Sequence, residues 1–149
     1  MKSDNKKIIC QNKKAHHEYF IEDTYECGIS LVGTEIKSIR LGKVSINEAY
    51  CYVEKGEMLI DGMHVSKYEQ GNIFNHDPDR IKKLLLHKKE IIRLQTKVQK
   101  DGFTLIPLSV YLTAGKCKVE LALAKGKKLY DKRESLKEKS IKMDLEKNR

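Results

Sequence analysis

The chain has 149 residues, a length that suits one domain with its own core and is too short for two ordinary domains. Its 30 Lys and Arg outnumber its 21 Asp and Glu, which gives a formal net charge of +9. This charge favours a polyanionic partner, either nucleic acid or an anionic membrane. A soluble protein with a lysine-rich surface would have the same composition. No run reaches the roughly 18 apolar residues of a membrane span, and the start lacks the apolar core of a secretion signal, so we expect a cytoplasmic protein.

The amino-terminal composition changes from basic to β-forming. Residues 1–16 are basic and weakly patterned, which indicates an arm outside the folded core. Residues 18–33, EYFIEDTYECGISLVG, are rich in the aromatic and β-branched residues that favour strands. We therefore expect one folded domain over residues 17–129, preceded by this arm.

A short helix is predicted next, over TEIKSIRLG, residues 34–42. Thr34 can cap its first turn, and Gly42 can end its last one. Lys37 and Arg40 are three residues apart, so they would lie together on a face away from the apolar positions.

Alternating apolar and polar residues then predict strands. The alternation is clear over residues 49–54, and the pair Lys55-Gly56 indicates a turn. Asp61-Gly62 lies between two apolar runs and is a strong signal for a two-residue hairpin. Together these features predict an antiparallel meander over residues 46–65.

The pattern becomes helical over residues 75–102. Asp77 is a good N-cap, Pro78 suits the first helical position, and Gly102 can stop the last turn. The apolar positions change phase, so two helices that break near His87 fit as well as one bent helix. The polar side would carry a series of basic residues: Arg80, Lys82, Lys83, Lys88, Lys89, Arg93, Lys97 and Lys100.

Strand periodicity returns over residues 104–123. Ala114-Gly115 marks a turn between two strands, and Pro107 is expected at an edge or a bulge because it has no N–H to donate. Many short antiparallel strands with an intervening helix indicate an α+β fold that is mainly β. A small oligonucleotide-binding (OB) barrel is one of several arrangements that fit this pattern.

Residues 130–149 form a highly charged tail with a thin apolar seam. An isolated helix of this length is marginal in water, so we expect the tail to be disordered when free and helical on a partner. Its net basic charge and Tyr130 suit RNA, with lysines for phosphates and a ring for stacking on a base. A frayed solubilising tail is the alternative.

No pattern of catalytic or metal-binding residues is evident in the sequence. His16 and His17 are adjacent, so their side chains do not converge on a helix or a strand, and we expect a surface pair that contacts RNA or nothing. The cysteines have neither a CxxC motif nor a His at zinc-ligand spacing, and we expect reduced thiols at all four: Cys10, Cys27, Cys51 and Cys117. We therefore expect neither an enzyme nor a cofactor.

Several segments, in the same order, resemble the SmpB family. They are NKKAHHEYFIEDTYECG, GTEIKSIRLGK, HDPDRIKKLLLHKKEI, LAKGKKLYDKR and the predicted hairpin before it, which contains Lys118, and the resemblance extends over nearly the whole chain. A series of separate motifs is more specific than one short pattern. The resemblance implies an OB-type antiparallel β-barrel with about three flanking helices and a disordered basic C-terminal tail.

The resemblance also implies a function. Proteins of this family bind the tRNA-like domain of transfer-messenger RNA (tmRNA, or SsrA RNA) and deliver it to stalled ribosomes for trans-translation, which rescues the ribosome and tags the nascent chain. The tail enters the empty mRNA channel of the small subunit near the decoding centre. The implied delivery complex also holds elongation factor Tu and alanyl-tmRNA, whereas no membrane and no DNA is implied. The protein would be cytoplasmic and ribosome-associated during rescue.

Matching the family's motifs position by position implies two groups of site residues. The RNA-binding group is Asn12, Lys13, Lys14, Glu26, Lys37, Arg40, Leu85, Lys118, Lys125, Lys127 and Lys128. Within it, Glu26 can accept hydrogen bonds from base amino groups or 2′-hydroxyls, and Leu85 would mainly support the surface by packing. The group at the decoding centre and in the tail is Tyr130, Asp131, Lys132, Arg133, Lys137, Lys139 and Lys142. Relatives often have His at the position of Tyr130, so only a stacking role is implied there.

Three other functions stay open on the sequence. An enzyme acting on RNA predicts turnover of its substrate. A general RNA chaperone or ribosome-associated RNA-binding protein predicts similar affinity for unrelated RNAs. A membrane-surface protein predicts binding to anionic vesicles and needs exposed bulky apolar residues beside its lysines.

Overall fold

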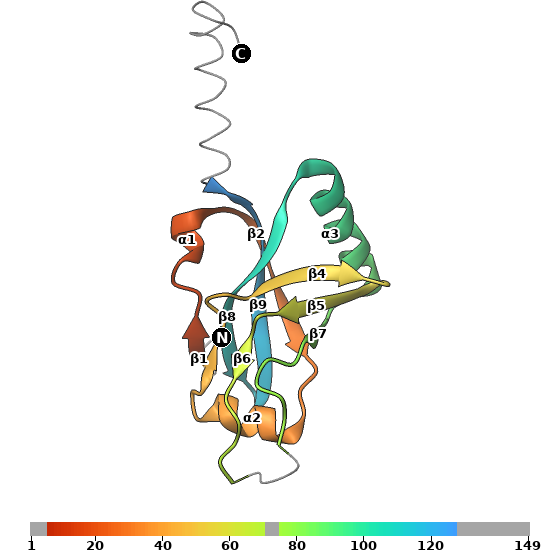
Figure 1. The fold of residues 1–149 in the computed structure, drawn as a ribbon. Coiled ribbons are helices and arrows are strands. Elements are labelled where there is room, and N and C mark those ends of the chain that lie inside the picture. Colours follow the sequence, from red (N-terminus) through yellow and green to blue (C-terminus); the bar gives the residue numbers. More distant parts are fainter. Residues whose placement is uncertain (1–5, 71–74, 128–149) are drawn as a thin grey trace, which may run out of the picture.

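The computed structural model describes residues 6–70 and 75–127 (Figure 1). Within these residues the chain is mainly β, with nine strands and three helices. The first half comprises β1 (Lys7–Gln11), α1 (Ala15–Glu18), β2 (Tyr19–Ile29), α2 (Gly33–Arg40), β3 (Val44–Ser45), β4 (Tyr50–Glu54) and β5 (Glu57–Asp61). The second half comprises β6 (His64–Val65), β7 (Lys82–Leu85), α3 (Lys88–Asp101), β8 (Thr104–Thr113) and β9 (Lys116–Gly126).

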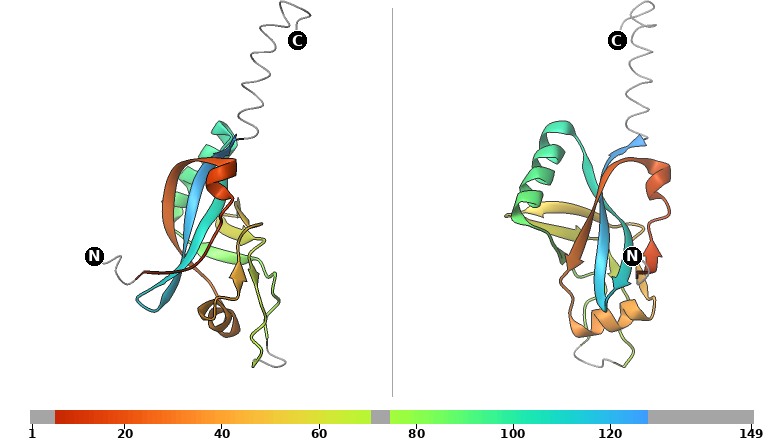
Figure 2. Two further views of the ribbon diagram at one scale, coloured as in Figure 1. Left: turned by 90° about the vertical axis from the view of Figure 1, so that its left-hand side faces the viewer. Right: turned by 180° about the vertical axis from the view of Figure 1, so that it is seen from behind.

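Seven strands form one antiparallel sheet in the order β1-β8-β4-β5-β7-β2-β9, and β8 also pairs with β9. β3 and β6 form a separate pair. In Figures 1 and 2 the long strands β2, β8 and β9 lie side by side, with α1 and α3 towards one end and α2 at the other. The strand β1 lies inside the weakly patterned segment 1–16, and its pairing with β8 could not be read from that segment's composition.

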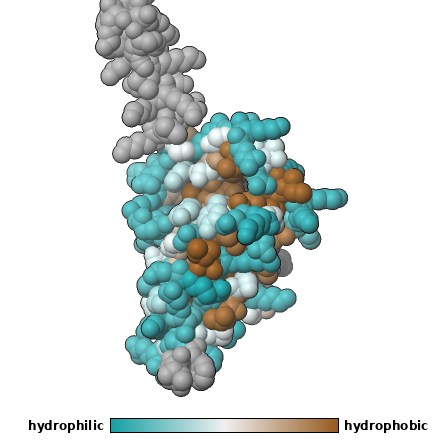
Figure 3. Space-filling model, turned by 45° about the vertical axis from the view of Figure 1, so that its right-hand side comes forward, coloured by the Kyte–Doolittle hydropathy of each residue, from teal (hydrophilic) through white to brown (hydrophobic). Residues whose placement is uncertain are grey.

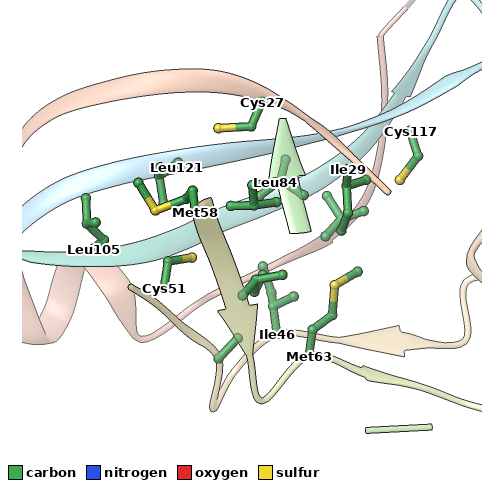
Figure 4. Close-up of a cluster of buried hydrophobic side chains, with 14 of the residues drawn as sticks. Cys27, Ile29, Ile46, Cys51, Met58, Met63, Leu84, Leu105, Cys117 and Leu121 are labelled. Atoms are coloured by element: carbon green, nitrogen blue, oxygen red, sulfur yellow. The ribbon is translucent and has the colours of Figure 1, made fainter. Parts of the chain in front are cut away.

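The main core lies between the sheet's inner face and the elements that cover it. Figure 4 shows side chains from β5, β7 and β9 pointing into one apolar cluster, among them Met58, Leu84 and Leu121. Ile91 and Leu94 of α3 are buried and belong to the same cluster. Burying these side chains supplies most of the driving force for folding, at about 25 cal/mol for each Å² of apolar surface.

A second, smaller cluster lies on the opposite face of β8 and β9. Pro107 interrupts the β8–β9 register, as expected for a proline at a bulge. Leu105 and Val110, on either side of the bulge, belong to the main core, whereas Ile106 and Leu108 belong to the second cluster together with residues of α1, β2 and β9. The strand β8 is therefore buried on both faces along most of its length.

The predicted short helix is confirmed as α2, but its cap differs. Gly42, at a φ of +81°, follows the last turn as expected. At the start, the carboxylate of Glu35 accepts a hydrogen bond of 2.9 Å from the N–H of Val32. Thr34 does not cap the helix, because α2 begins at Gly33 and Thr34 lies inside the first turn, where its hydroxyl is 2.8 Å from Nδ1 of His76.

The predicted helix over the first part of residues 75–102 is wrong. Residues 82–85 form β7, which pairs with β2 and β5, and the helix α3 begins only at Lys88. Along β7, Lys82 and Leu84 are buried, while Lys83 and Leu85 are exposed. The predicted end is confirmed, because Gly102 terminates α3 in the left-handed conformation.

The meander over residues 46–65 is confirmed for β4 and β5, which turn at Lys55-Gly56. The hairpin predicted at Asp61-Gly62 is wrong, since β6 pairs with β3. Gly62 serves a different purpose: at a φ of +84°, a Cβ there would lie 2.6 Å from the carbonyl oxygen of Glu48. A glycine is therefore required for this close approach of two backbone segments.

Candidate nucleic-acid interface

The strands β7, β2, β9 and β8 carry two neighbouring rows of side chains on the face opposite the main core. The first row is Leu85, Gly28, Lys118 and Tyr111. The second row is Glu26, Glu120 and Ser109. Directly paired residues of a sheet point to the same side, so these seven residues share one surface, which we name the outer face.

Hydrogen bonds connect the two rows of the outer face. The hydroxyl of Tyr111 donates to Oε2 of Glu26 over 2.8 Å, and the hydroxyl of Ser109 donates to Oε1 of Glu120 over 3.3 Å. Burial raises the pKa of Tyr111, and the bond to Glu26 raises it further, so this phenol remains a donor. The ammonium of Lys6 lies 4.2 Å from the centre of the Tyr111 ring, where it adds positive charge beside the carboxylates.

The outer face is hollowed where it meets the turn after β1. One pocket of ≈ 410 Å³ is lined by Asn12, Lys13 and Glu120, among others, and a neighbouring pocket is lined by Glu26 and Tyr111. Both pockets are also bordered by Thr24 and Glu120, so they meet along β2 and β9. We name the joined pockets the polar groove, lined by Lys6, Asn12, Lys13, Thr24, Glu26, Ser109, Tyr111 and Glu120.

Asn12 is a buried polar residue of the polar groove. Its Nδ2 donates to the carbonyl oxygen of Pro107 over 3.3 Å, and its backbone N–H donates to the carbonyl oxygen of Leu108 over 2.8 Å. Its Oδ1 is buried and receives no hydrogen bond from any residue that the structure describes. A buried acceptor without a donor is costly, and it marks a place where a ligand or a water can bind.

Leu85 lies at the other end of the first row and is 49% exposed. It packs over Gly28, where an added Cβ would lie 3.3 Å from both Cβ and Cδ1 of the leucine. Leu85 therefore does more than support the surface by packing, which is the role expected of it. About half of its side chain faces solvent near Lys118 on the outer face. An exposed leucine beside a lysine can cover the apolar face of a ribose or a base.

A second surface lies near the end of β9 and contains two of the predicted RNA-binding residues, Lys125 and Lys127, beside two phenylalanines that the sequence reasoning missed. Phe20 and Phe103 line a pocket of ≈ 260 Å³ together with Lys125. The ammonium of Lys125 lies 4.7 Å from the centre of the Phe103 ring, and that of Lys127 lies 5.1 Å from the centre of the Phe20 ring. Lys127 also donates to the carbonyl oxygen of His16 over 2.7 Å. The available signal was the occurrence of aromatic residues and lysines on, or directly next to, the strands β2, β8 and β9.

The other predicted RNA-binding residues are not brought to the outer face. Lys14 lies 3.5 Å from the carboxylate of Glu48, with both side chains exposed. Lys37 and Arg40 lie on α2, at the opposite end of the molecule from α1 (Figure 1). Lys128 and the whole decoding-centre and tail group lie outside the described residues, namely Tyr130, Asp131, Lys132, Arg133, Lys137, Lys139 and Lys142.

A buried ionic cluster, also missed by the sequence reasoning, fixes α2 to the segment before β7. Arg80 donates to both carboxylate oxygens of Glu35, from Nε over 2.9 Å and from Nη2 over 2.7 Å. The same Nη2 also donates to the carbonyl oxygen of Ser30 over 3.1 Å. Lys82 approaches the same carboxylate and donates to the carbonyl oxygens of Met63 and Arg80.

The surface holds no sign of a metal centre in the part of the chain that the structure describes. There, no three His, Cys, Asp or Glu side chains gather closely enough to hold a metal ion. None of the three described helices is long and apolar enough to cross a membrane. Figure 3 shows one side of the molecule, on which apolar patches are scattered among hydrophilic side chains.

Comparisons with known proteins agree on one family. The family model described as SmpB protein matches residues 9–149. The SsrA-binding protein of Caldicellulosiruptor saccharolyticus is 56% identical over 146 residues, which cover 98% of this chain and 92% of the relative. The SsrA-binding protein of Geobacillus kaustophilus is 55% identical over 140 residues, which cover 94% and 90%. A solved structure described as "tmRNA-SmpB: a journey to the center of the bacterial ribosome" is similar at 46% identity and a TM-score of 0.66, over 79% of this chain and 83% of that one.

Proposed function

The chain belongs to the SmpB family, and from this premise we propose that it binds the tRNA-like domain of tmRNA through the outer face of its sheet. One observation carries the proposal. The strand register brings Glu26, Leu85 and Lys118, from three separate family motifs, into two adjacent rows, and Asn12 borders the same groove. Relatives named SsrA-binding protein support the choice of RNA.

The chemistry of the outer face suits folded RNA. Lys6, Lys13 and Lys118 supply positive charge for phosphates, which position an RNA without reading its sequence. The carboxylates of Glu26 and Glu120 accept hydrogen bonds, which 2′-hydroxyls and base amino groups can donate. A surface with both kinds of group can bind the backbone and still discriminate among RNAs.

We propose further that the protein delivers tmRNA to stalled ribosomes in the cytosol. In this role residues 130–149 probe the empty mRNA channel of the small subunit, with Tyr130 stacking near the decoding centre and the following lysines facing RNA. Elongation factor Tu and alanyl-tmRNA complete the delivery complex, and the sheet with its helices acts as an OB-type barrel. The solved structure named for tmRNA-SmpB and the bacterial ribosome supports this proposal.

A competition titration tests the proposed function. Full-length protein and a 1–129 truncation are titrated with labelled tmRNA in the presence of excess ordinary tRNA. We expect both chains to bind tmRNA far more tightly than the competitor, and we expect the truncation to lose rescue of stalled ribosomes. Equal affinity for both RNAs would contradict the proposal and favour a general RNA-binding protein.

The same titration with variants of the outer face tests which of its residues contribute to tmRNA binding. Glu26→Ala and Lys118→Ala should each weaken tmRNA binding. Glu54→Ala and Lys100→Ala are matched controls, because these exposed side chains lie on β4 and α3, away from the outer face. Unchanged affinity of the first two variants would remove their residues from the site.

A further inference from the structure

We propose that the polar groove binds one unpaired guanine, whose N1–H and exocyclic amine donate to the carboxylates of Glu26 and Glu120. The inference rests on the proposed RNA-binding function and names the chemical group that the outer face selects. Glu120 would then be a specificity-determining residue, in addition to the positions that the family motifs imply.

Two carboxylates, those of Glu26 and Glu120, line the polar groove and are only partly engaged by the protein. Each carboxylate has one oxygen engaged, Oε2 of Glu26 by Tyr111 and Oε1 of Glu120 by Ser109. No donor among the described residues reaches the second oxygen of either carboxylate. Asn12, 8% exposed, lies beside them, and its buried Oδ1 receives no hydrogen bond from any described residue. A ligand that pairs with both carboxylates must bring at least two hydrogen-bond donors.

Repulsion between the carboxylates of Glu26 and Glu120 destabilises the free protein. Glu26 and Glu120 are directly paired across β2 and β9, so two negative charges lie side by side on one surface. Like charges in such pairs destabilise a sheet. A ligand whose donors lie between the carboxylates would offset this repulsion, and Lys6 and Lys13 stand at the two ends of the groove for the adjoining phosphates.

Guanine is the base whose pairing edge fits this pattern. It presents two adjacent donors, N1–H and the exocyclic amine, to a pair of acceptors. Adenine and cytosine present one amino group beside a ring acceptor, and that acceptor would face a carboxylate. Uracil presents a single N–H between two carbonyl oxygens. The groove therefore disfavours the other three bases by unpaired or repulsive contacts.

Nuclear magnetic resonance on the ¹⁵N-labelled full-length chain tests the proposal with GMP, IMP and AMP as probes. We expect GMP to shift the amides of Thr24, Glu26 and Glu120. IMP lacks the exocyclic amine and should bind about tenfold more weakly, since one hydrogen bond to a charged group is lost. Glu120→Gln should reduce GMP affinity by about the same factor, while Glu54→Gln should leave it unchanged.

Several outcomes would overturn the proposal: equal affinity for GMP and AMP, shifts confined to other surfaces, or no shift with any nucleotide. Thermal unfolding of Glu120→Gln serves as the control for folding. A wild-type protein that binds tmRNA selectively yet does not prefer GMP would leave the proposed function standing and remove this inference. Loss of selective tmRNA binding in the titration above would remove the proposed function itself.

Discussion

Lys82 and Glu35 place their ammonium and carboxylate groups 3.8 Å apart, and neither side chain has any exposed surface. Burial alone would raise the pKa of the Glu35 carboxyl, but hydrogen bonds from Arg80 and from the N–H of Val32, with the charge of Lys82, hold it below its ordinary value. Burial lowers the pKa of Lys82, against the attraction of Glu35. Two cations therefore depend on one buried carboxylate.

Replacing this carboxylate should destabilise the fold strongly. Glu35→Gln leaves the charges of Arg80 and Lys82 without their buried partner, so we expect the free energy of unfolding to fall by about 3–5 kcal/mol at neutral pH. Urea denaturation followed by circular dichroism measures the change. The exposed control Glu54→Gln should stay within about 0.5 kcal/mol of the wild type. A similarly small effect at Glu35 would show that its ion pairs contribute little.

Acidification should weaken the same interaction. The folded pKa of Glu35 lies below its ordinary value of 4.5, so the carboxylate's contribution is complete above pH 4.5. The contribution is lost as the pH falls through the lower, folded pKa. Urea midpoints from about pH 6 to about pH 3 should therefore fall more steeply for the wild type than for Glu35→Gln. Parallel profiles for the two proteins would contradict this assignment.

The contact between Gly28 and Leu85 should matter more for RNA than for stability. Gly28→Ala forces Leu85 to move by a few tenths of an ångström, and Leu85→Ala removes the half-exposed side chain. We expect each variant to lower tmRNA affinity about fivefold and to change the free energy of unfolding by less than about 1 kcal/mol. Because both act at one contact, the double variant should bind no worse than Leu85→Ala alone. If the losses of tmRNA affinity in the two single variants instead add up in the double variant, the two residues act independently and not through one contact.

Salt dependence should identify the lysine that contacts phosphate. If Lys118 neutralises one phosphate of the tRNA-like domain, Lys118→Met should reduce the slope of log K against log salt by roughly 0.9. Lys100→Met on α3 carries the same change in charge and should leave the slope unaltered. Equal effects of both variants would indicate a diffuse field of positive charge rather than a contact.

The four cysteines should react slowly with thiol reagents in the native protein. Burial raises the pKa of Cys27 to about 12 and that of Cys10 and Cys117 to about 11, from an ordinary value of 9.0. Burial also raises the pKa of Cys51. At pKa values near 11, thiolates at neutral pH are about a hundredfold rarer than for a free cysteine. Labelling by a water-soluble disulfide reagent should be slow without urea and fast with it; rapid native labelling of Cys27 would contradict its burial.

The sequence predicted helix ends, turns and a bulge correctly where a glycine or proline at that position determines them. Gly42 and Gly102 follow α2 and α3 because both residues adopt a positive φ at a helix end, a preference that the sequence expresses directly. The turns at Lys55-Gly56 and Ala114-Gly115 and the bulge at Pro107 also follow from the residues themselves. These features fix the boundaries of most long elements.

Distant partners explain the features that local signals missed. The strand β7 looked helical because its apolar residues flank two lysines, and only the buried Glu35 explains why Lys82 points inwards. Thr34 lies inside α2, which begins at Gly33, and its hydroxyl contacts His76, far along the chain. The rows of the outer face depend on the register between strands that lie about ninety residues apart, as Gly28 and Lys118 do.

The register also couples the proposed RNA surface to the core. Cys27 and Val119 are paired and buried, and the next pair outwards, Glu26 and Glu120, faces the groove. A slip of one residue between β2 and β9 would turn the side chains of one strand over, so that one of the two carboxylates would enter the apolar interior and a core residue would be exposed. A change of register that misaligned the groove would therefore disrupt the core at the same time.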